Sequence, residues 1–156
     1  MRSCSARTLR LKRSIEPIIE KRAGHAAYSC ACSGSCYNPR MEKRTGGCHC
    51  GKVRYEAEVD LEQPVIECNC SHCEIKGLLI TFVPRESFRL ISGEGEMTEY
   101  LFNTEQLHHM FCSTCGVESF ATGEKDGAKM YGVNVRTIDD IDLEKLKRMP
   151  YDGRSR

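Results

Sequence analysis

Tryptophan is absent from this 156-residue chain, and aromatic residues make up only 7% of it. No apolar run approaches the roughly 20 residues that a membrane-spanning helix needs, so we expect no membrane span. The basic N-terminus has no continuous apolar stretch, which argues against a secretory signal. Aliphatic and aromatic content is otherwise ordinary, so we expect a packed core, though a small one, and a small core gains stability from added cross-links.

Cysteine, by contrast, is abundant, because the chain has 11. A secreted disulfide scaffold would space its cysteines at longer intervals, and an odd number leaves one thiol unpaired. Short C-x-C and C-x-x-C spacings instead suit metal chelation in a reducing compartment. We therefore predict thiolate–metal chemistry in the cytoplasm. The three tight groups are Cys48-His-Cys50, Cys68-Asn-Cys70-Ser-His-Cys73 and Cys112-Ser-Thr-Cys115.

Charge divides the chain near residue 44. Residues 1–44 carry 10 Lys/Arg against 3 Asp/Glu, whereas residues 45–156 carry 13 against 19. We interpret 1–44 as a basic, largely disordered extension with one short helical stretch at 15–22, and Met41 as an alternative start. Its Cys30, Cys32 and Cys36 are interpreted as free thiols, because a metal site needs positioned ligands. Residues 45–156 form one domain, whose acidic balance gives no indication of a nucleic-acid-binding face.

Short alternating or apolar segments, separated by turn signals, follow from residue 45 onward. Residues 52–59 alternate with period two, as a half-exposed strand does. Helical signals in this part are confined to 74–77 and 142–147. We predict an all-β fold, mainly strands with one or two short helices, cross-linked by zinc. The expected strands are 52–59, 65–68, 78–83, 88–92, 98–102, 108–111, 119–122 and 130–135.

The first and third cysteine groups supply two sulfurs each, from positions far apart in the chain. A C-x-C hairpin and a C-x-x-C turn together provide the four ligands of a tetrahedral zinc site. Glycines flank both groups and let the backbone turn its amides toward sulfur. We predict that Cys48, Cys50, Cys112 and Cys115 hold a structural zinc. The alternative is four buried free thiols, which would have no reason to recur at chelating spacing.

The middle group then contains three thiolates, Cys68, Cys70 and Cys73. Three protein ligands and an open fourth position are the arrangement of a catalytic zinc. A small-molecule thiol in that position would have its pKa lowered and would be held as a thiolate.

Histidines near these groups leave alternatives open. His72 could close the middle group, or a distant ligand such as His108 or His109 could make it a second structural site. His72 and His109 are also candidates for proton transfer. His49, between two expected ligands, is interpreted as a solvent-facing loop residue.

The three motifs resemble those of the glutathione-dependent formaldehyde-activating enzyme family, also called the centromere protein V family. They read Gly46-Gly-Cys-His-Cys-Gly-Lys-Val-Arg-Tyr55, Cys68-Asn-Cys-Ser-His-Cys73 and Phe111-Cys-Ser-Thr-Cys-Gly116. Four further segments resemble the centromere protein V-like branch: Tyr100-Leu-Phe-Asn-Thr104, His109-Met-Phe-Cys112, Gly132-Val-Asn-Val-Arg136 and Tyr151-Asp-Gly-Arg-Ser155. The resemblance covers residue 45 to about 154 and implies a zinc-containing β fold of the Mss4-like type.

The resemblance also implies two zinc ions per chain, a structural one at the outer groups and a catalytic one at the middle group. It implies carbon–sulfur lyase activity, in which glutathione and formaldehyde form S-hydroxymethylglutathione or the adduct is cleaved. Glutathione is a dicarboxylate, so its binding site should offer cations, for which Lys76, Arg85, Arg89 and Arg136 are candidates. The alternatives are a non-catalytic zinc module that contacts protein or nucleic acid, and a thiol-based metal or redox sensor.

Overall fold

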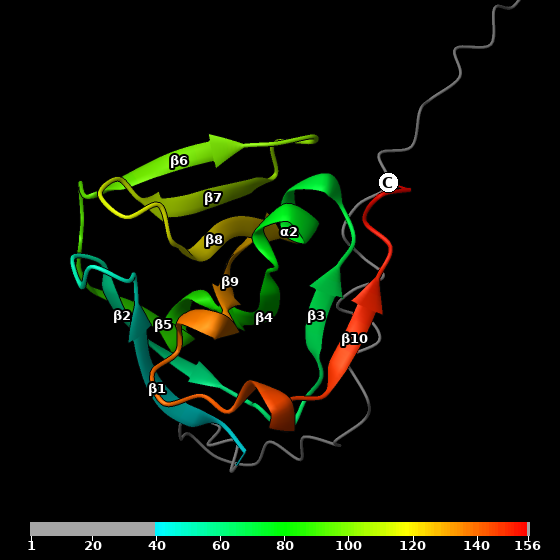
Figure 1. Cartoon of the computed structure of the whole chain (residues 1–156), viewed down its shortest axis with the longest axis horizontal. Helices are drawn as coiled ribbons and strands as arrows, with labels where there is room; N and C mark the ends of the chain where they lie inside the picture. Colours follow the sequence, from blue (N-terminus) through cyan, green and yellow to red (C-terminus); the bar gives the residue numbers. More distant parts are fainter. Residues whose placement is uncertain (1–39, 156) are drawn as a thin grey trace, which may run out of the picture. The chain divides into compact units, whose positions relative to one another are not determined.

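The computed structural model describes residues 40–155. Most of the extension predicted at 1–44, with its helix at 15–22, therefore lies outside the described residues. Strands dominate the described part and its helices are short, so the mainly β fold class is confirmed (Figure 1). In chain order the elements are β1 (Glu42–Gly47), β2 (Arg54–Val59), β3 (Val65–Cys68), α2 (Ser71–Lys76), β4 (Leu79–Pro84), η1 (Arg85–Ser87), β5 (Phe88–Ser92), β6 (Met97–Leu101), β7 (Leu107–Cys112), β8 (Glu118–Lys125), β9 (Ala128–Asn134), η2 (Val135–Thr137), η3 (Leu143–Lys145) and β10 (Arg148–Tyr151).

Seven strands form the larger sheet, in the order β10-β3-β4-β9-β8-β7-β6. From β3 to β6 all neighbours are antiparallel. β10 is parallel to β3, with Arg148 opposite Val65 and Tyr151 opposite Cys68. Figure 1 shows this pair at one side of the domain, in green and red. The last strand therefore runs in the same direction as the strand that leads into the middle cysteine group.

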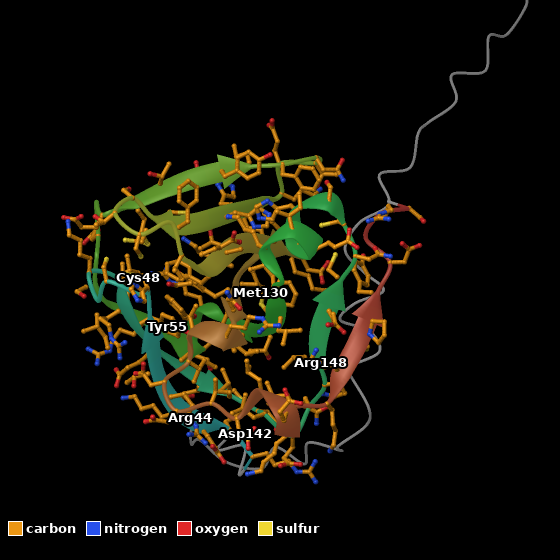
Figure 2. The ribbon with its side chains drawn as sticks, in the orientation of Figure 1. Arg44, Cys48, Tyr55, Met130, Asp142 and Arg148 are labelled. Carbon is orange, nitrogen blue, oxygen red and sulfur yellow. The ribbon has the colours of Figure 1, made fainter. Side chains whose placement is uncertain are left out.

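β1, β2 and β5 form a second, antiparallel sheet. β2 alternates as the sequence predicts, with Tyr55, Ala57 and Val59 buried. Tyr55, labelled in Figure 2, packs on Phe88 of its own sheet and Phe120 of the larger sheet, with ring centroids 5.4 and 6.3 Å away. These contacts join the two sheets through an aromatic core, where ring pairs stabilise the fold beyond their buried area.

Each of the eight predicted strands overlaps an observed strand, with ends that differ by up to three residues. Two strands were missed. β1 carries polar side chains on both faces, and only Gly46 is buried in it, so no alternation marks it. It begins at Glu42, inside the segment that the sequence assigned to the extension. β10 contains Pro150, which is tolerated because β10 is an edge strand.

The helical predictions were right in place and imprecise in extent. The turn predicted at 74–77 is α2, which begins at Ser71. The segment predicted at 142–147 is the 3₁₀ turn η3, capped by the Asp142 side chain, followed by β10. Within the described residues no helix is long and apolar enough to cross a membrane.

Candidate metal centres and the adjoining acid–histidine cluster

The outer cysteine group brings two distant turns together. Cys48 and Cys50 follow β1, while Cys112 ends β7 and Cys115 lies in the turn after it. All four Sγ atoms lie within 4.8 Å of one another. Cys50 Sγ is 3.5 Å from Cys48 Sγ and 3.6 Å from Cys112 Sγ. The structure thus assembles the four sulfurs that the sequence paired, in a number that suits tetrahedral coordination.

Backbone amides point at these sulfurs, as the flanking glycines suggested. The Val53 N–H donates to Cys48 Sγ at 3.3 Å. Gly116, at φ +74°, lets the chain reverse after the second pair. Backbone amides, that of Val117 foremost, lower the pKa of Cys115 to about 6. The surroundings therefore favour a thiolate at Cys115, which is the form that binds metal. At Cys50 a backbone hydrogen bond from Lys52 lowers the pKa, but burial and the neighbouring thiols outweigh it and raise the pKa to about 11.

The middle group is local, and its geometry comes from the start of one short helix. Cys68 ends β3, Cys70 is the N-cap of α2, and Cys73 lies in the first turn. Cys70 Sγ accepts from the Cys73 N–H at 3.4 Å, and Cys68 Sγ accepts from the Cys70 N–H at 3.4 Å. The three Sγ atoms lie within 4.8 Å of one another. Soft thiolate donors in this arrangement fit zinc.

The three thiols of the middle group share their protons unequally. A hydrogen bond with Cys73 is the largest of the causes that lower the pKa of Cys68, to about 6. The same interaction raises the pKa of Cys73, and burial adds to that rise. Cys68 therefore ionises readily, and its negative charge opposes the ionisation of Cys73. A cation placed among the sulfurs would relieve this repulsion, which is how metal binding releases thiol protons.

A buried carboxylate that the sequence did not single out, Glu118, stands beside α2. Its Oε2 is 3.1 Å from His72 Nε2, and its Oε1 is 2.7 Å from His109 Nδ1. The two imidazole centroids are 4.1 Å apart. Lys76 Nζ donates to Glu118 Oε2 at 2.7 Å. We call these four residues the acid–histidine cluster.

This cluster is an ion-pair network, although its three non-lysine members are near enough to one another to hold a metal. Burial alone would raise the pKa of Glu118, but hydrogen bonds from His109 and Lys76 outweigh burial and lower it to about 2. Glu118 is therefore ionised, and the Lys76 ammonium supplies its counter-charge. A metal cation would have to displace that ammonium.

Aromatic rings cover the imidazole of His72. Tyr100 and Phe102 stack on it, with centroid distances of 5.3 and 6.0 Å. Burial in this environment, followed by the charge of His109, lowers the pKa of His72. In Figure 1 the β6–β7 hairpin lies above α2, and Tyr100 belongs to β6 of this hairpin. The ring is therefore fixed on its faces by stacking and at its edge by Glu118.

The structure places the predicted histidines apart from the cysteine groups. His72 and His109 both turn toward Glu118, and His108 pairs with Glu99 at the surface. Among residues 40–155 no histidine nitrogen joins the group of Cys68, Cys70 and Cys73. The sequence gives no signal for Glu118 beyond its position three residues after Cys115, because a lone glutamate forms no recognisable motif.

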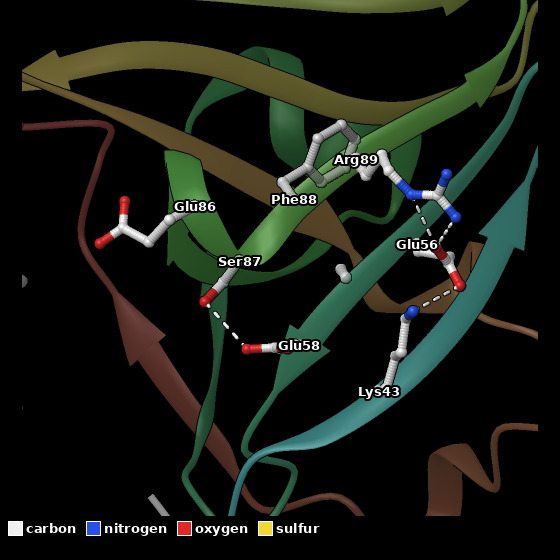
Figure 3. Close-up of a pocket in the computed structure, with 8 residues that line it drawn as sticks. Lys43, Glu56, Glu58, Glu86, Ser87, Phe88 and Arg89 are labelled. Carbon is white, nitrogen blue, oxygen red and sulfur yellow. Dashed lines mark hydrogen bonds and ion pairs between the residues drawn. The ribbon is translucent and has the colours of Figure 1, made fainter. Parts of the chain in front are cut away.

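The cationic candidates fall into two sets. Lys76 belongs to the acid–histidine cluster, and Arg136 Nε donates at 2.6 Å to the carbonyl of Gly77, which caps α2. Arg89 instead pairs with Glu56 beside a shallow cavity of about 190 Å³ on the smaller sheet (Figure 3). Arg85 lines a neighbouring hollow of about 500 Å³. Charged side chains dominate the first cavity, and no cysteine lines either one.

The fold and these two groups define a class, that of small β domains whose clustered thiols could hold metal ions. Within that class the chain belongs to the glutathione-dependent formaldehyde-activating enzyme family, whose model matches residues 43–150. The resemblance seen in the motifs is thereby confirmed. The chain is also similar to a crystal structure of a Rhodobacter sphaeroides protein, with 30% sequence identity and a TM-score of 0.60 over 68% of this chain and 97% of that one.

Proposed function

We propose that this chain is a zinc-dependent carbon–sulfur lyase that makes or breaks a thiol adduct such as S-hydroxymethylglutathione. The observation that carries the proposal is the group of Cys68, Cys70 and Cys73, which no fourth Cys, His, Asp or Glu joins among residues 40–155. Three thiolates leave one tetrahedral position for a further ligand. The name of the family supplies the substrate class, glutathione and formaldehyde.

A zinc ion on these three sulfurs would lower the pKa of a substrate thiol at the fourth position. In adduct formation a bond forms between the thiol sulfur and the carbonyl carbon, and the thiol proton ends on the new hydroxyl oxygen. Cleavage reverses both changes. The chain's own residues have to orient the thiol and carry that proton.

We assign the proton transfer to His72, with His109 as its neighbour in the acid–histidine cluster. An ionised Glu118 only accepts hydrogen bonds, so the protons sit on His72 Nε2 and His109 Nδ1. The neutral His72 ring then keeps Nδ1 as its acceptor nitrogen. Because His72 immediately precedes Cys73, the same turn of α2 carries a proposed metal ligand and a proposed proton carrier.

For the carboxylates of glutathione, position favours Lys76 and Arg136. Both lie at α2, the helix that also carries two cysteines of the middle group. Arg85 and Arg89 line hollows in which no cysteine takes part. A substrate with its sulfur at the middle group would meet the first pair.

The test compares the protein with a Cys70→Ser variant. We expect the wild type to hold two zinc ions and to accelerate exchange between glutathione-bound and free formaldehyde, followed by NMR with ¹³C-labelled formaldehyde. Cys70→Ser should lose one zinc and this acceleration. S-methylglutathione, which keeps both carboxylates but has no thiol, is the matched ligand control and should bind more weakly than glutathione. If exchange survives in Cys70→Ser while one zinc is lost, the proposal is wrong.

A second reading, a non-catalytic zinc module, is favoured by exposed apolar side chains near the site. Ile75 of α2 is 86% exposed, and Tyr100 and Leu101 of β6 are 45% and 38% exposed. A partner protein would cover such residues. Crystals grown with glutathione separate the two readings: sulfur density at the middle metal supports the enzyme, and a protein side chain in that position supports the module.

A further inference from the structure

Residues 151–154, which begin with the last residue of β10, lie against the loop between Cys68 and Cys70. The centre of the contact is Asn69. Its N–H donates to the Tyr151 carbonyl at 3.1 Å, and its Nδ2 donates to Asp152 Oδ1 at 3.1 Å. Its Oδ1 accepts from the Arg154 N–H at 3.0 Å. The segment therefore forms hydrogen bonds with the backbone N–H, Nδ2 and Oδ1 of Asn69, the residue between two cysteines.

Gly153 brings this segment to the cysteines themselves. A Cβ on residue 153 would stand 2.5 Å from Cys68 Sγ and 3.2 Å from Cys70 Cβ. The first distance is far inside van der Waals contact, so only glycine fits without a shift. The Gly153 N–H donates to the Tyr151 carbonyl at 3.0 Å, which holds its backbone beside Cys68. Backbone held next to a ligand residue helps to orient its sulfur.

Two further contacts hold residues 151–154 in place. β10 pairs with β3 up to Tyr151 and Cys68, so the segment starts in register with the first cysteine. The Arg154 guanidinium pairs with Glu74 on the exposed side of α2. The segment therefore bridges the strand and the helix between which the middle group lies.

We propose that residues 151–154 form a strap that positions the middle metal site, with the Asn69–Asp152 pair as its clasp and Gly153 as its contact with sulfur. The strap closes one side of the cysteine loop. Asn69, Asp152 and Gly153 are positioning residues, since they act through Cys68 and Cys70. The inference rests on the proposed occupation of this group by zinc.

The experiment follows the release of zinc from the full-length, zinc-loaded protein to excess chromogenic chelator in a stopped-flow instrument. Cys70→Ser identifies the phase that belongs to the middle group, because that phase should vanish. Asn69→Asp places a carboxylate against Asp152, and we expect it to accelerate this phase about 10–100-fold, as loss of a ligand's hydrogen-bond partner does. The other phase should not change.

A swap of the two side chains supplies the rescue. In Asn69→Asp with Asp152→Asn, the amide of residue 152 donates to the carboxylate of residue 69, which still accepts from the Arg154 N–H. Release should return to within about threefold of the wild-type rate. Gly153→Ala should accelerate the middle phase without any change of polar groups, and cobalt(II)-substituted protein should show an altered thiolate–metal absorption band. Asp126→Asn, in an exposed turn, is the matched control.

Three outcomes would overturn the strap. They are an Asn69→Asp variant with unchanged release, a swapped double variant as fast as Asn69→Asp, and acceleration of both phases together, which would indicate general loosening. A wild type with a single zinc and no phase removed by Cys70→Ser would instead refute the proposed function, and the strap with it. The two failures are therefore distinguishable.

Discussion

The outer and middle cysteine groups are built in opposite ways. Cys50 and Cys112, whose sulfurs nearly touch, are separated by 62 residues in the chain. The middle group takes its three sulfurs from one run of residues between β3 and α2. A cross-link between distant segments removes more freedom from the unfolded chain than a local one. The outer group is therefore suited to hold the fold together, and the middle group is suited to chemistry.

Their surroundings differ in the same sense. Beside the middle group stands the acid–histidine cluster, in which Glu118 is buried and compensated by Lys76. Beside the outer group stand backbone amides and apolar side chains of the core. Thiols of both groups have shifted pKa values, so the difference lies in these neighbours. A buried carboxylate with two imidazoles beside the middle group agrees with the chemical role proposed for that group.

The largest effect on stability is expected from Cys112→Ala, in the outer group. Cys112 is 1% exposed, and its loss should release the outer metal and detach the turn after β7 from β1. We expect the free energy of unfolding to fall by about 3–5 kcal/mol. Denaturation of zinc-loaded protein measures this. A variant as stable as the wild type would contradict the structural role.

Cys70→Ala should do less to the fold. It removes a side-chain N-cap, which is worth about 1 kcal/mol, and opens a group whose ligands are already neighbours in the chain. Denaturation under identical conditions should therefore give a loss well below that of Cys112→Ala. Equal losses would show that both groups are structural.

Glu118→Gln tests the acid–histidine cluster beside the middle group. It removes the charge that Lys76 and His109 address, and we expect a loss of roughly 1–3 kcal/mol at neutral pH with zinc content unchanged. The folded-state pKa of about 2 lies below the ordinary 4.5, so the charge stabilises the fold above pH 4.5 and ceases to do so as the pH falls toward 2. The stability difference between variant and wild type should shrink over that range. A difference independent of pH would refute this account.

The smallest effect is expected from Arg136→Gln. It removes an exposed cation at α2, and the loss of one such attraction, about 0.5–1 kcal/mol, should raise the KM for glutathione about two- to fivefold. Arg89→Gln, on the smaller sheet, is the matched control and should leave KM unchanged. Equal KM values for both variants would remove Arg136 from the binding site.

Much of the fold could be predicted because apolar alternation reports burial directly, as in β2. β1 could not, because its pairing with β2 buries little beyond Gly46. β10 could not, because a parallel edge strand with a proline is fixed by a partner far away in the sequence. Local pattern reports what a segment buries and does not report what it pairs with.

The candidate site could likewise be predicted only where a local sequence pattern marks it. Cysteine spacing encodes which sulfurs can meet, and the structure brings together the two groups that the sequence proposed. Glu118 and Asn69 were not singled out, since neither belongs to a repeated spacing. Their roles come from tertiary neighbours: two imidazoles and an ammonium for Glu118, and a segment 83 residues further along the chain for Asn69.

The parallel pairing of β3 with β10 also sets an order of assembly. All four outer sulfurs have been synthesised once the chain reaches Cys115, whereas the neighbours of Cys68 arrive only with residues 148–154. The side of the middle group that faces residues 151–154 is therefore the last part of either cysteine group to be supplied by the growing chain.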